Sequence, residues 1–230
     1  MRDLRSVEDV LRMLDGWFAA DAAKWDQFYA DREKPIPFFV AKPDESLASW
    51  LSTGVLPKGR ALDLGCGHGR NAIALAQAGF DVDAVDLSSS AIEWGKARAA
   101  EASVDVRFHQ ADIFTVALPH DRYDLVYDSG CLHHLPPHRR VSYRDLIDRV
   151  LEPGGHFGLV CFAAGAMGSE RTDEELYRAG SLEGGLAYDQ DSLRWIFSDY
   201  TEVELRPMAE QPDDAATFGK DFLLTALFRR

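Results

Sequence analysis

The chain has 230 residues, 46% hydrophobic and 27% charged, which is ordinary for one globular domain with a sizeable core. Its 38 acidic and 25 basic side chains give a formal net charge of −13, which argues against a nucleic-acid binder that relies on a basic surface. No apolar run reaches membrane-spanning length, and the charged first residues do not fit a signal peptide, so we expect a cytoplasmic protein.

The first 58 residues predict a helical segment ahead of the regular part of the chain. Apolar residues recur there at three- and four-residue steps, at Val7, Val10, Leu11, Leu14, Trp17 and Phe18, and roughly again at Trp25, Phe28 and Tyr29. Pro35 and Pro37 interrupt any helix. A second short helix around Leu47 and Trp50 is expected to end near Gly54.

From residue 59 to residue 162, apolar strands alternate with helices. We expect strands at residues 60–64, 82–85, 104–108, 123–127 and 156–162, and helices at residues 71–78, 88–100 and 139–151. Ser88 or Ser90 is expected to cap the second of these helices, and Ser90 with Glu93 fits a capping box. Such alternation builds a parallel sheet that helices cover on both faces.

Residues 163–187 break this rhythm, because they are rich in glycine and charge, with a short helix expected at 173–177. Residues 188–230 then predict a helix capped by Asp189 and two strands, at 201–208 and 222–228. The whole chain therefore predicts a single α/β domain with a Rossmann-like, doubly wound, mostly parallel sheet of seven strands. Segments 1–58 and 163–187 are additions to its core at 59–162, and active-site covers are commonly made from such additions.

Glycine occupies every second position of the loop in Asp63-Leu64-Gly65-Cys66-Gly67-His68-Gly69, directly after the first strand of this core. A helix starts immediately after it. Glycine lets the backbone approach a ligand closely, and the helix offers free N–H groups at its start. The loop predicts a binding site for a nucleotide-like ligand.

Further polar residues follow the next strands, at the edge of a parallel sheet where ligands bind. Asp86 can accept both hydroxyl hydrogens of a ribose. Asp112 can accept from an adenine amine while the Ile113 N–H donates to a ring nitrogen, and Asp128, or a carbonyl near it, can take an ammonium group. Asp63 is expected to orient the glycine loop by accepting its backbone N–H groups.

The combination of these motifs resembles the class I S-adenosylmethionine-dependent methyltransferases. It comprises the glycine loop, Asp86, Asp112, the strand 123–128 and the turn Leu151-Glu152-Pro153-Gly154-Gly155. The resemblance implies S-adenosylmethionine as cofactor, S-adenosylhomocysteine as product, and a last strand inserted antiparallel. The cofactor-binding residues that it implies are Tyr29, Gly65, Cys66, Gly67, Asp86, Leu87, Asp112, Ile113 and Asp128.

Two other functions are compatible with a glycine loop. A nicotinamide-dinucleotide oxidoreductase is disfavoured, because Arg70 stands where its fingerprint expects a third glycine. A sensor or partner subunit that binds S-adenosylmethionine without transferring a methyl group stays open. For an enzyme, we expect methyl transfer to a small-molecule acceptor by in-line displacement, in a monomer or a homodimer, with no nucleic-acid or membrane partner.

The acceptor is expected beside the sequence Cys131-Leu132-His133-His134-Leu135-Pro136-Pro137-His138, after the fourth strand of the core. His133 or His134 can serve as a base or orient the acceptor, since histidine titrates near neutrality, although a structural role is the alternative. A metal site is disfavoured, because the spacing matches no common ligand motif. Tyr29 or Trp25 is expected either to cover the sulfonium with an aromatic face or to anchor a helix.

Overall fold

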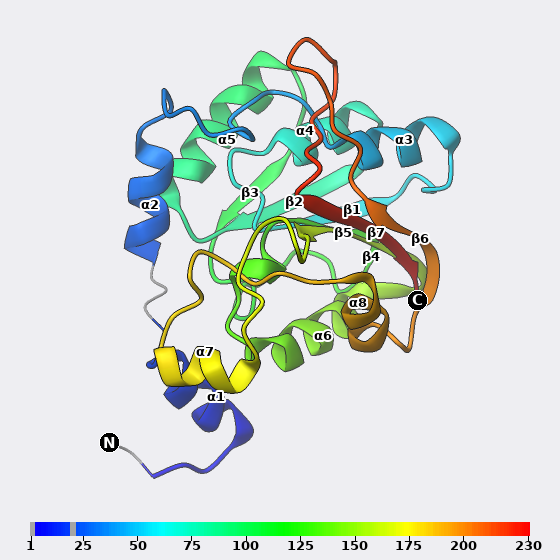
Figure 1. The fold of residues 1–230 in the computed structure, drawn as a ribbon. Helices are drawn as coiled ribbons and strands as arrows, with labels where there is room; N and C mark the ends of the chain where they lie inside the picture. Colours follow the sequence, from blue (N-terminus) through cyan, green and yellow to red (C-terminus); the bar gives the residue numbers. More distant parts are fainter. Residues whose placement is uncertain (1–2, 19–21) are drawn as a thin grey trace.

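The computed structural model describes residues 3–18 and 22–230, and its centre is one seven-stranded sheet (Figure 1). The strand order is β3-β2-β1-β4-β5-β7-β6. The strands are β1 (Arg60–Leu64), β2 (Asp81–Asp86), β3 (Arg107–Gln110), β4 (Tyr123–Ser129), β5 (Leu151–Phe162), β6 (Thr201–Pro207) and β7 (Leu223–Arg229).

The sheet is parallel except for β7, which pairs antiparallel with both β5 and β6. This confirms the predicted mostly parallel, doubly wound sheet and the inserted antiparallel last strand. The chain reverses its direction of winding between β1 and β4, so the carboxyl ends of these neighbouring strands open a crevice. Gly65 and Ser129 stand at these two ends.

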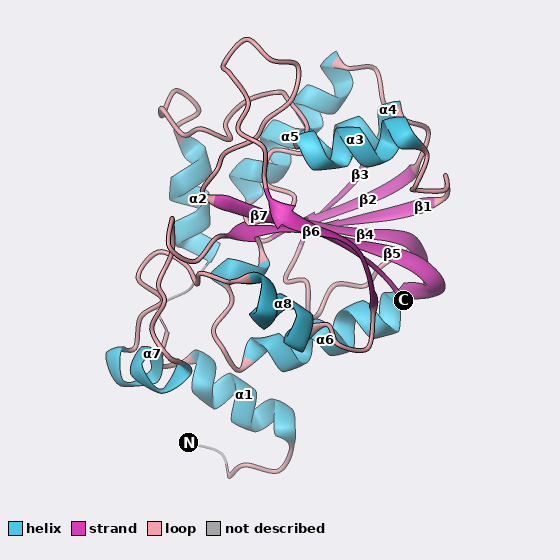
Figure 2. Ribbon diagram, turned by 45° about the vertical axis from the view of Figure 1, so that its right-hand side comes forward, coloured by secondary structure: helices cyan, strands magenta, loops and turns pink. Residues whose placement is uncertain are grey.

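Helices cover both faces of the sheet, with α3, α4 and α5 on one side and α6 and α8 on the other (Figure 2). The helices are α1 (Val7–Asp15), α2 (Ala22–Ala30), α3 (Glu45–Thr53), α4 (Arg70–Gln77), α5 (Ser89–Glu101), α6 (Arg139–Val150), α7 (Asp173–Ala179) and α8 (Gln190–Ile196), with a 3-10 turn η1 (Leu132–His134). Side chains alternate between the two faces of the sheet along β4. Val126 packs into the hydrophobic core on one face, and Leu125 and Tyr127 pack into the core on the other.

The N-terminal segment forms two separate helices, α1 and α2, whereas the apolar pattern predicted one apolar helix face running from Val7 to Tyr29. A capping box between Ser6 and Asp9 starts α1, which ends at Asp15 and buries none of its residues. Its Val7 is 72% exposed, so the apolar periodicity does not mark a core face here. Polar contacts connect α1 to the rest of the protein: Arg139 of α6 donates hydrogen bonds to the carboxylate of Asp15.

Three other predictions were wrong in detail, the first being the start of β5, which lies at Leu151 and not at His156 after a turn. Ser88 alone caps α5, because its hydroxyl accepts from the Ala91 N–H, and no capping box forms between Ser90 and Glu93. The strand β3 begins at Arg107, three residues later than predicted. None of the helices in the described part of the chain is long and apolar enough to cross a membrane.

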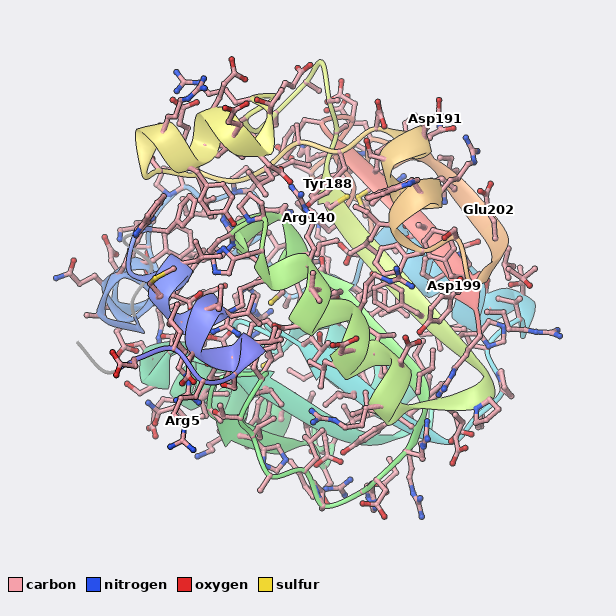
Figure 3. The ribbon with its side chains drawn as sticks, turned by 90° about the horizontal axis from the view of Figure 1, so that it is seen from below. Arg5, Arg140, Tyr188, Asp191, Asp199 and Glu202 are labelled. Carbon is pink, nitrogen blue, oxygen red and sulfur yellow. The ribbon has the colours of Figure 1, made fainter. Side chains whose placement is uncertain are left out.

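The segment between β5 and α8 folds back on itself, through isolated bridges of Ala163 with Tyr188 and of Ser169 with Leu186. It carries α7, whose Asp173 accepts from Arg140 of α6 at 2.8 Å. Arg140 also donates to the Tyr188 hydroxyl at 3.1 Å, and Figure 3 shows these two side chains together on the underside of the molecule. The segment is therefore fastened to α6 and lies beside the crevice.

Candidate active site

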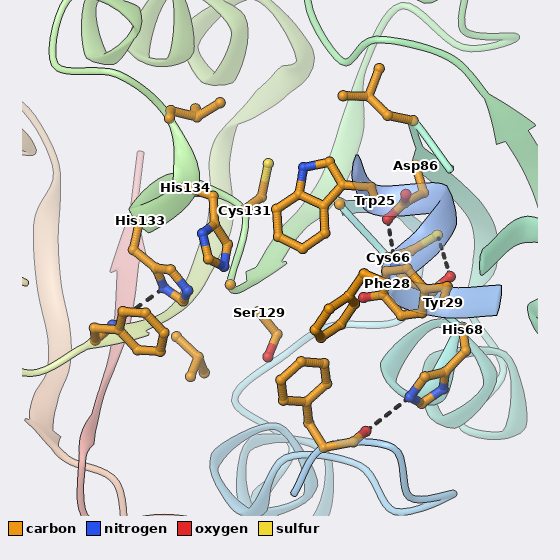
Figure 4. A pocket seen from close by; sticks show the side chains of 18 of the residues that line it. Trp25, Phe28, Tyr29, Cys66, His68, Asp86, Ser129, Cys131, His133 and His134 are labelled. Carbon is orange, nitrogen blue, oxygen red and sulfur yellow. Dashed lines mark hydrogen bonds between the residues drawn. The ribbon is translucent and has the colours of Figure 1, made fainter. Parts of the chain in front are cut away.

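A cavity of about 850 Å³ opens at the carboxyl ends of β1, β2 and β4 (Figure 4). Its walls come from the glycine loop, α2, the segment around Phe38, η1 and the segment that follows β5. Small-molecule sites measure about 300–1,000 Å³, so this cavity has room for a nucleoside and a second small ligand. Its lining includes every residue of the predicted cofactor set except Asp128, together with His133 and His134.

The glycine loop needs its glycines at the cavity wall. Gly65 and Gly67 have φ angles of 65° and 52°, in the left-handed region that side chains disfavour. A Cβ on Gly67 would lie 2.6 Å from the Tyr29 hydroxyl, and one on Gly65 would lie 2.7 Å from the Cys131 Cβ. The neighbouring Cys66 is half-buried in the same wall. The two glycines thus let the loop backbone lie closer to Tyr29 and Cys131 than any residue with a side chain could.

Asp86, at the end of β2, braces this loop. Its Oδ2 accepts from the Gly67 N–H at 2.8 Å, and its Oδ1 accepts from the Ser88 N–H at 2.8 Å. Burial raises the pKa of this carboxyl, while the two backbone N–H donors oppose the rise. Each carboxylate oxygen still has a lone pair for a ligand hydroxyl. Leu87 follows, 39% exposed, at the rim of the cavity.

Asp63 does not have the position expected for it. The glycine loop is held by Asp86, and the Asp63 carboxylate instead accepts from the Ala72 backbone in α4. Its Oδ2 is buried and has no hydrogen-bond partner among the described residues. Burial raises the pKa of this carboxyl well above its ordinary value, and the nearby Asp128 adds to the rise. A cationic group in the cavity is the natural partner for such an oxygen.

Asp112 and Ile113 lie on the cavity wall in the loop after β3. The Asp112 Oδ1 accepts from the Phe114 N–H at 2.8 Å, which fixes a tight turn. Ile113 is 6% exposed and belongs to the hydrophobic core. This geometry keeps the Asp112 carboxylate at the wall, with a second oxygen for a ligand.

Asp128 departs from the sequence prediction, since it does not line the cavity. Its carboxylate is completely buried and accepts from the backbone N–H groups of Cys131 and Leu132, at 2.7 and 2.9 Å. The Tyr143 hydroxyl of α6 donates to the same carboxylate at 2.5 Å. Burial raises its pKa to about 6 against these donors. Asp128 therefore braces the loop that carries the histidines and lies outside the cavity lining.

His133 and His134 project from η1 into the cavity (Figure 4). The His133 ring stacks on Phe162 with centroids 3.7 Å apart, and its Nδ1 accepts from the Phe162 N–H at 3.3 Å. Burial lowers the pKa of His133 well below its ordinary value and that of His134 to about 4, with the Lys24 charge adding to the latter. Both rings are thus neutral at physiological pH.

The helix α2 covers the cavity with aromatic side chains. Trp25 packs edge-on against His134, with centroids 4.8 Å apart, while Tyr29 is buried and stacks with Phe39 at 5.5 Å. Phe162 completes the aromatic wall. It was not predicted as a site residue, although its position at the carboxyl end of β5 indicates one. Trp25 and Tyr29 are therefore both cavity walls and anchors of the N-terminal segment.

Arg70 occupies the position of the missing third glycine, and its side chain is nearly buried beside the cavity. It donates to the Asp44 carboxylate at 2.7 Å and to the Ser129 hydroxyl at 3.0 Å. Its guanidinium also lies 4.6 Å from the centre of the Phe218 ring. Asp44 could not be predicted from sequence patterns, because this ion pair joins the N-terminal segment to α4 only in the folded chain.

No group of three or more metal-ligating side chains gathers anywhere in residues 3–18 and 22–230. His138, the third histidine near η1, hydrogen-bonds to the Tyr177 hydroxyl at 2.8 Å and to Asp15 at 2.9 Å. It therefore ties α1 and α7 to the start of α6. The cysteines Cys66, Cys131 and Cys161 are free thiols.

Comparison with known proteins gives matches to methyltransferases. A family model described as a methyltransferase domain matches residues 61–155. The chain is 27% identical over 169 residues to 2-heptyl-1-hydroxyquinolin-4(1H)-one methyltransferase of Mycobacteroides abscessus, covering 73% of this chain and 69% of that protein. It is 30% identical over 128 residues to a probable thiol methyltransferase of Arabidopsis thaliana, covering 55% of this chain and 56% of the relative.

The fold matches as well. The structure of Burkholderia thailandensis 1,6-didemethyltoxoflavin-N1-methyltransferase, with its substrate and S-adenosylhomocysteine bound, aligns with a TM-score of 0.67. The alignment covers all of this chain and 92% of the other at 20% identity. These comparisons give no support to an oxidoreductase or to a non-catalytic sensor. Residues 61–155 thus match a methyltransferase domain, and the comparisons support an S-adenosylmethionine-dependent methyltransferase.

Proposed function

We propose that this methyltransferase methylates a small, largely apolar acceptor held between His133, His134 and the aromatic wall. The observation that carries the proposal is the composition of the cavity: acidic side chains, with an unpaired buried oxygen on Asp63, at one end and neutral imidazoles with aromatic rings at the other. The acidic end fits the cofactor, and the neutral end fits an uncharged acceptor.

The residues at the acidic end fit S-adenosylmethionine group by group. The unpartnered Oδ2 of Asp63 suits the ammonium group, and the free lone pairs of Asp86 suit the ribose hydroxyls. Asp112 and Ile113 suit the adenine edge, while Gly65, Cys66, Gly67, Leu87 and Tyr29 supply the close-fitting wall. When bound, the cofactor supplies an electrophilic methyl group.

The two histidines divide the work at the acceptor end. His133 accepts from the Phe162 N–H at Nδ1, so its proton resides on Nε2, which has no other partner among the described residues. His133 therefore donates a hydrogen bond and orients the acceptor. His134 is also neutral, so one of its ring nitrogens carries no proton and can receive one from the acceptor.

The low pKa of His134, about 4, limits the chemistry that it can assist. A base this weak helps little with an ordinary alcohol, because proton transfer works best when the pKa of the base is near the working pH. The acceptor atom must therefore be a good nucleophile or carry an acidic proton. An N-hydroxy group or a thiol meets this requirement, and the two relatives described above are named for such acceptors.

An acceptor screen tests this proposal. The purified chain is incubated with S-adenosylmethionine and either 2-heptyl-1-hydroxyquinolin-4(1H)-one, thiophenol or a simple aliphatic alcohol, and S-adenosylhomocysteine release is measured. We expect turnover of one or both acidic acceptors and none of the alcohol. Turnover of the alcohol alone would contradict the proposal, and so would absence of methyl transfer to every acceptor.

Variants of the histidines refine the same assay. His134→Gln should lower kcat by about 10²-fold with the N-hydroxy acceptor, the low end of general-base catalysis because the base is weak, and only slightly with a thiol, because a thiolate needs little base catalysis. His133→Phe should raise KM for either acceptor, since it keeps the aromatic stack and removes the donor. An equal loss from both variants with both acceptors would contradict the division of roles.

Further expectations belong to this proposal. The apolar cavity and the acidic composition favour a small-molecule acceptor over nucleic acid. The three free thiols favour a reducing, cytoplasmic environment. A monomer or a homodimer is the expected state, which sedimentation analysis would decide.

A further inference from the structure

Asp26, in the middle of the cavity cover α2, makes a cluster of bonds to the start of α5. Its Oδ1 accepts from the Ser88 hydroxyl at 2.8 Å, from the Ser89 hydroxyl at 3.1 Å and from the Ser90 backbone N–H at 3.1 Å. These residues form the first turn of α5, where free N–H groups and the helix dipole favour a negative charge. One carboxylate thereby joins two segments that lie 62 or more residues apart in sequence.

The same first turn holds the carboxylate that suits the ribose. The Ser88 N–H donates to the Asp86 Oδ1 at 2.8 Å, while the Ser88 hydroxyl donates to Asp26. Asp86 in turn holds the Gly67 N–H of the glycine loop. Ser88 is therefore a shared partner of the cover and of the nucleoside end of the cavity. The negative charge of Asp26 is close enough to raise the pKa of Asp86.

Several other contacts that α2 makes over the cavity are aromatic. Trp25 packs against His134 and Phe28 against Phe38, with centroids 4.8 and 6.0 Å apart. Such ring contacts help to hold α2 against the cavity but allow small shifts of the helix, since they are less directional than hydrogen bonds. The bonds of Asp26 are directional, and the backbone N–H of Ser90 and the hydroxyl of Ser88 lower its pKa, so it is charged at neutral pH. Asp26 fixes the register of α2 on the core.

We propose that Asp26 is the positioning residue that fastens α2 over the nucleoside end of the cavity and thereby slows the release of the cofactor. This inference rests on the proposed function, because it takes the nucleoside of S-adenosylmethionine as the ligand beneath α2. The bound nucleoside and the fastened helix stabilise each other, since both use the first turn of α5 and the carboxylate of Asp86. Asp26 itself contacts no reacting atom.

Four variants test the role of Asp26. Asp26→Ala removes the acceptor, and Asp26→Asn keeps one oxygen without the charge. Ser89→Ala removes a hydroxyl donor that makes no other hydrogen bond within the described part of the chain. Glu93→Ala is the matched control, because it removes one exposed negative charge from the same helix, away from the cavity. The affinity and the dissociation rate of S-adenosylhomocysteine are measured by calorimetry and by stopped-flow tryptophan fluorescence, with urea unfolding alongside.

We expect Asp26→Ala to raise both the Kd and the dissociation rate of S-adenosylhomocysteine about tenfold, the size of one hydrogen bond to a charged group. Asp26→Asn should recover part of this loss, Ser89→Ala should raise both values about threefold, and Glu93→Ala should leave them within twofold. A double-mutant cycle should show that Asp26→Ala and Ser89→Ala are not additive in the dissociation rate.

An Asp26→Ala variant that is less stable in urea but releases S-adenosylhomocysteine at the wild-type rate would overturn the inference, because it would show a purely structural role. Strict additivity in the cycle would overturn it too. A wild-type chain that binds no S-adenosylhomocysteine would be a different result, since it would contradict the proposed function as well.

Discussion

The Arg70 guanidinium donates to the Asp44 carboxylate at 2.7 Å inside the protein, where the two side chains are 8% and 0% exposed. Asp44 also accepts from the Asn71 amide at 2.9 Å and from the Tyr127 hydroxyl at 2.8 Å. This pair joins the segment before α3, the first turn of α4 and the strand β4 beside the cavity. It replaces the close backbone packing that a third glycine would give to a dinucleotide site.

Substitution of Asp44 by Ala should destabilise the fold strongly. It leaves the Arg70 charge buried and unpaired and removes the acceptor for two further donors, and breaking a buried pair in this way costs about 3–5 kcal/mol. Urea unfolding of Asp44→Ala measures the loss. Glu174→Ala, which breaks the exposed pair with Arg178, is the control and should cost less than about 1 kcal/mol. Equal losses would contradict the importance given to the buried pair.

The pH dependence of stability should report on Asp128. Its folded pKa of about 6 lies above the ordinary aspartate value, so the folded chain binds a proton more tightly than the unfolded chain between about pH 4 and pH 6. This group therefore makes the protein less stable as the pH rises through that window, and its contribution is constant above it. The Tyr143 hydroxyl, which donates to the carboxylate, limits the loss.

Tyr143→Phe should accordingly be more harmful at pH 7.5 than at pH 5. At pH 7.5 the carboxylate is ionised and the lost hydrogen bond to a charged group is worth about 1.5–3 kcal/mol, whereas at pH 5 Asp128 is mostly protonated and the loss is smaller. Urea unfolding of wild type and variant at the two pH values gives the difference. A loss that is the same at both would contradict the raised pKa of Asp128.

Gly67→Ala should damage cofactor binding through Tyr29. The new Cβ would lie 2.6 Å from the Tyr29 hydroxyl at a φ of 52°, so α2 must move away from the loop. We expect the Kd for S-adenosylhomocysteine to rise at least about tenfold. Adding Tyr29→Phe should recover part of the affinity, because the nearest ring atom then lies 3.2 Å away.

Gly54→Ala is the control for the glycine effect. This residue ends α3 at a φ of 73° with nothing within 4 Å of a Cβ, so the substitution brings only the left-handed strain of about 1–2 kcal/mol. Its effect should appear in the free energy of unfolding and not in cofactor affinity. Equal Kd values for the two variants would show that the space at Gly67 is unimportant.

Local patterns predicted the core of the site well. The strand β1, the glycine loop and Asp86 follow from a short apolar run, a helix start and an acid at a strand end, and all are found together at the cavity. The prediction for β3 was displaced because the alternating apolar residues Val104, Val106 and Phe108 favour a strand that begins at 104, whereas the strand begins at Arg107. In the fold Arg107 and His109 bind the buried Asp83 of β2, so charge settles the register.

The directions of side chains and the contacts between distant segments could not be predicted from the sequence. Asp128 lies near the carboxyl end of its strand, as Asp86 does, but the chain then turns into η1. The backbone N–H groups of Cys131 and Leu132 donate to its carboxylate. The role of Asp26 could not be predicted, because its hydrogen-bond partners lie at the start of a helix more than 60 residues later. The sequence shows which side chains reach the strand ends, and packing decides which of them face the ligand.

The most direct test of the account is a calorimetric titration with S-adenosylhomocysteine, S-adenosylmethionine and NAD of the wild type and of Asp86→Asn. We predict micromolar binding of the two sulfur nucleosides, none of NAD, and a loss of roughly 10–100-fold in the variant, since each hydrogen bond to a charged group is worth about 1.5–3 kcal/mol. Binding of NAD alone, or unchanged binding of S-adenosylhomocysteine by a folded Asp86→Asn, would contradict it.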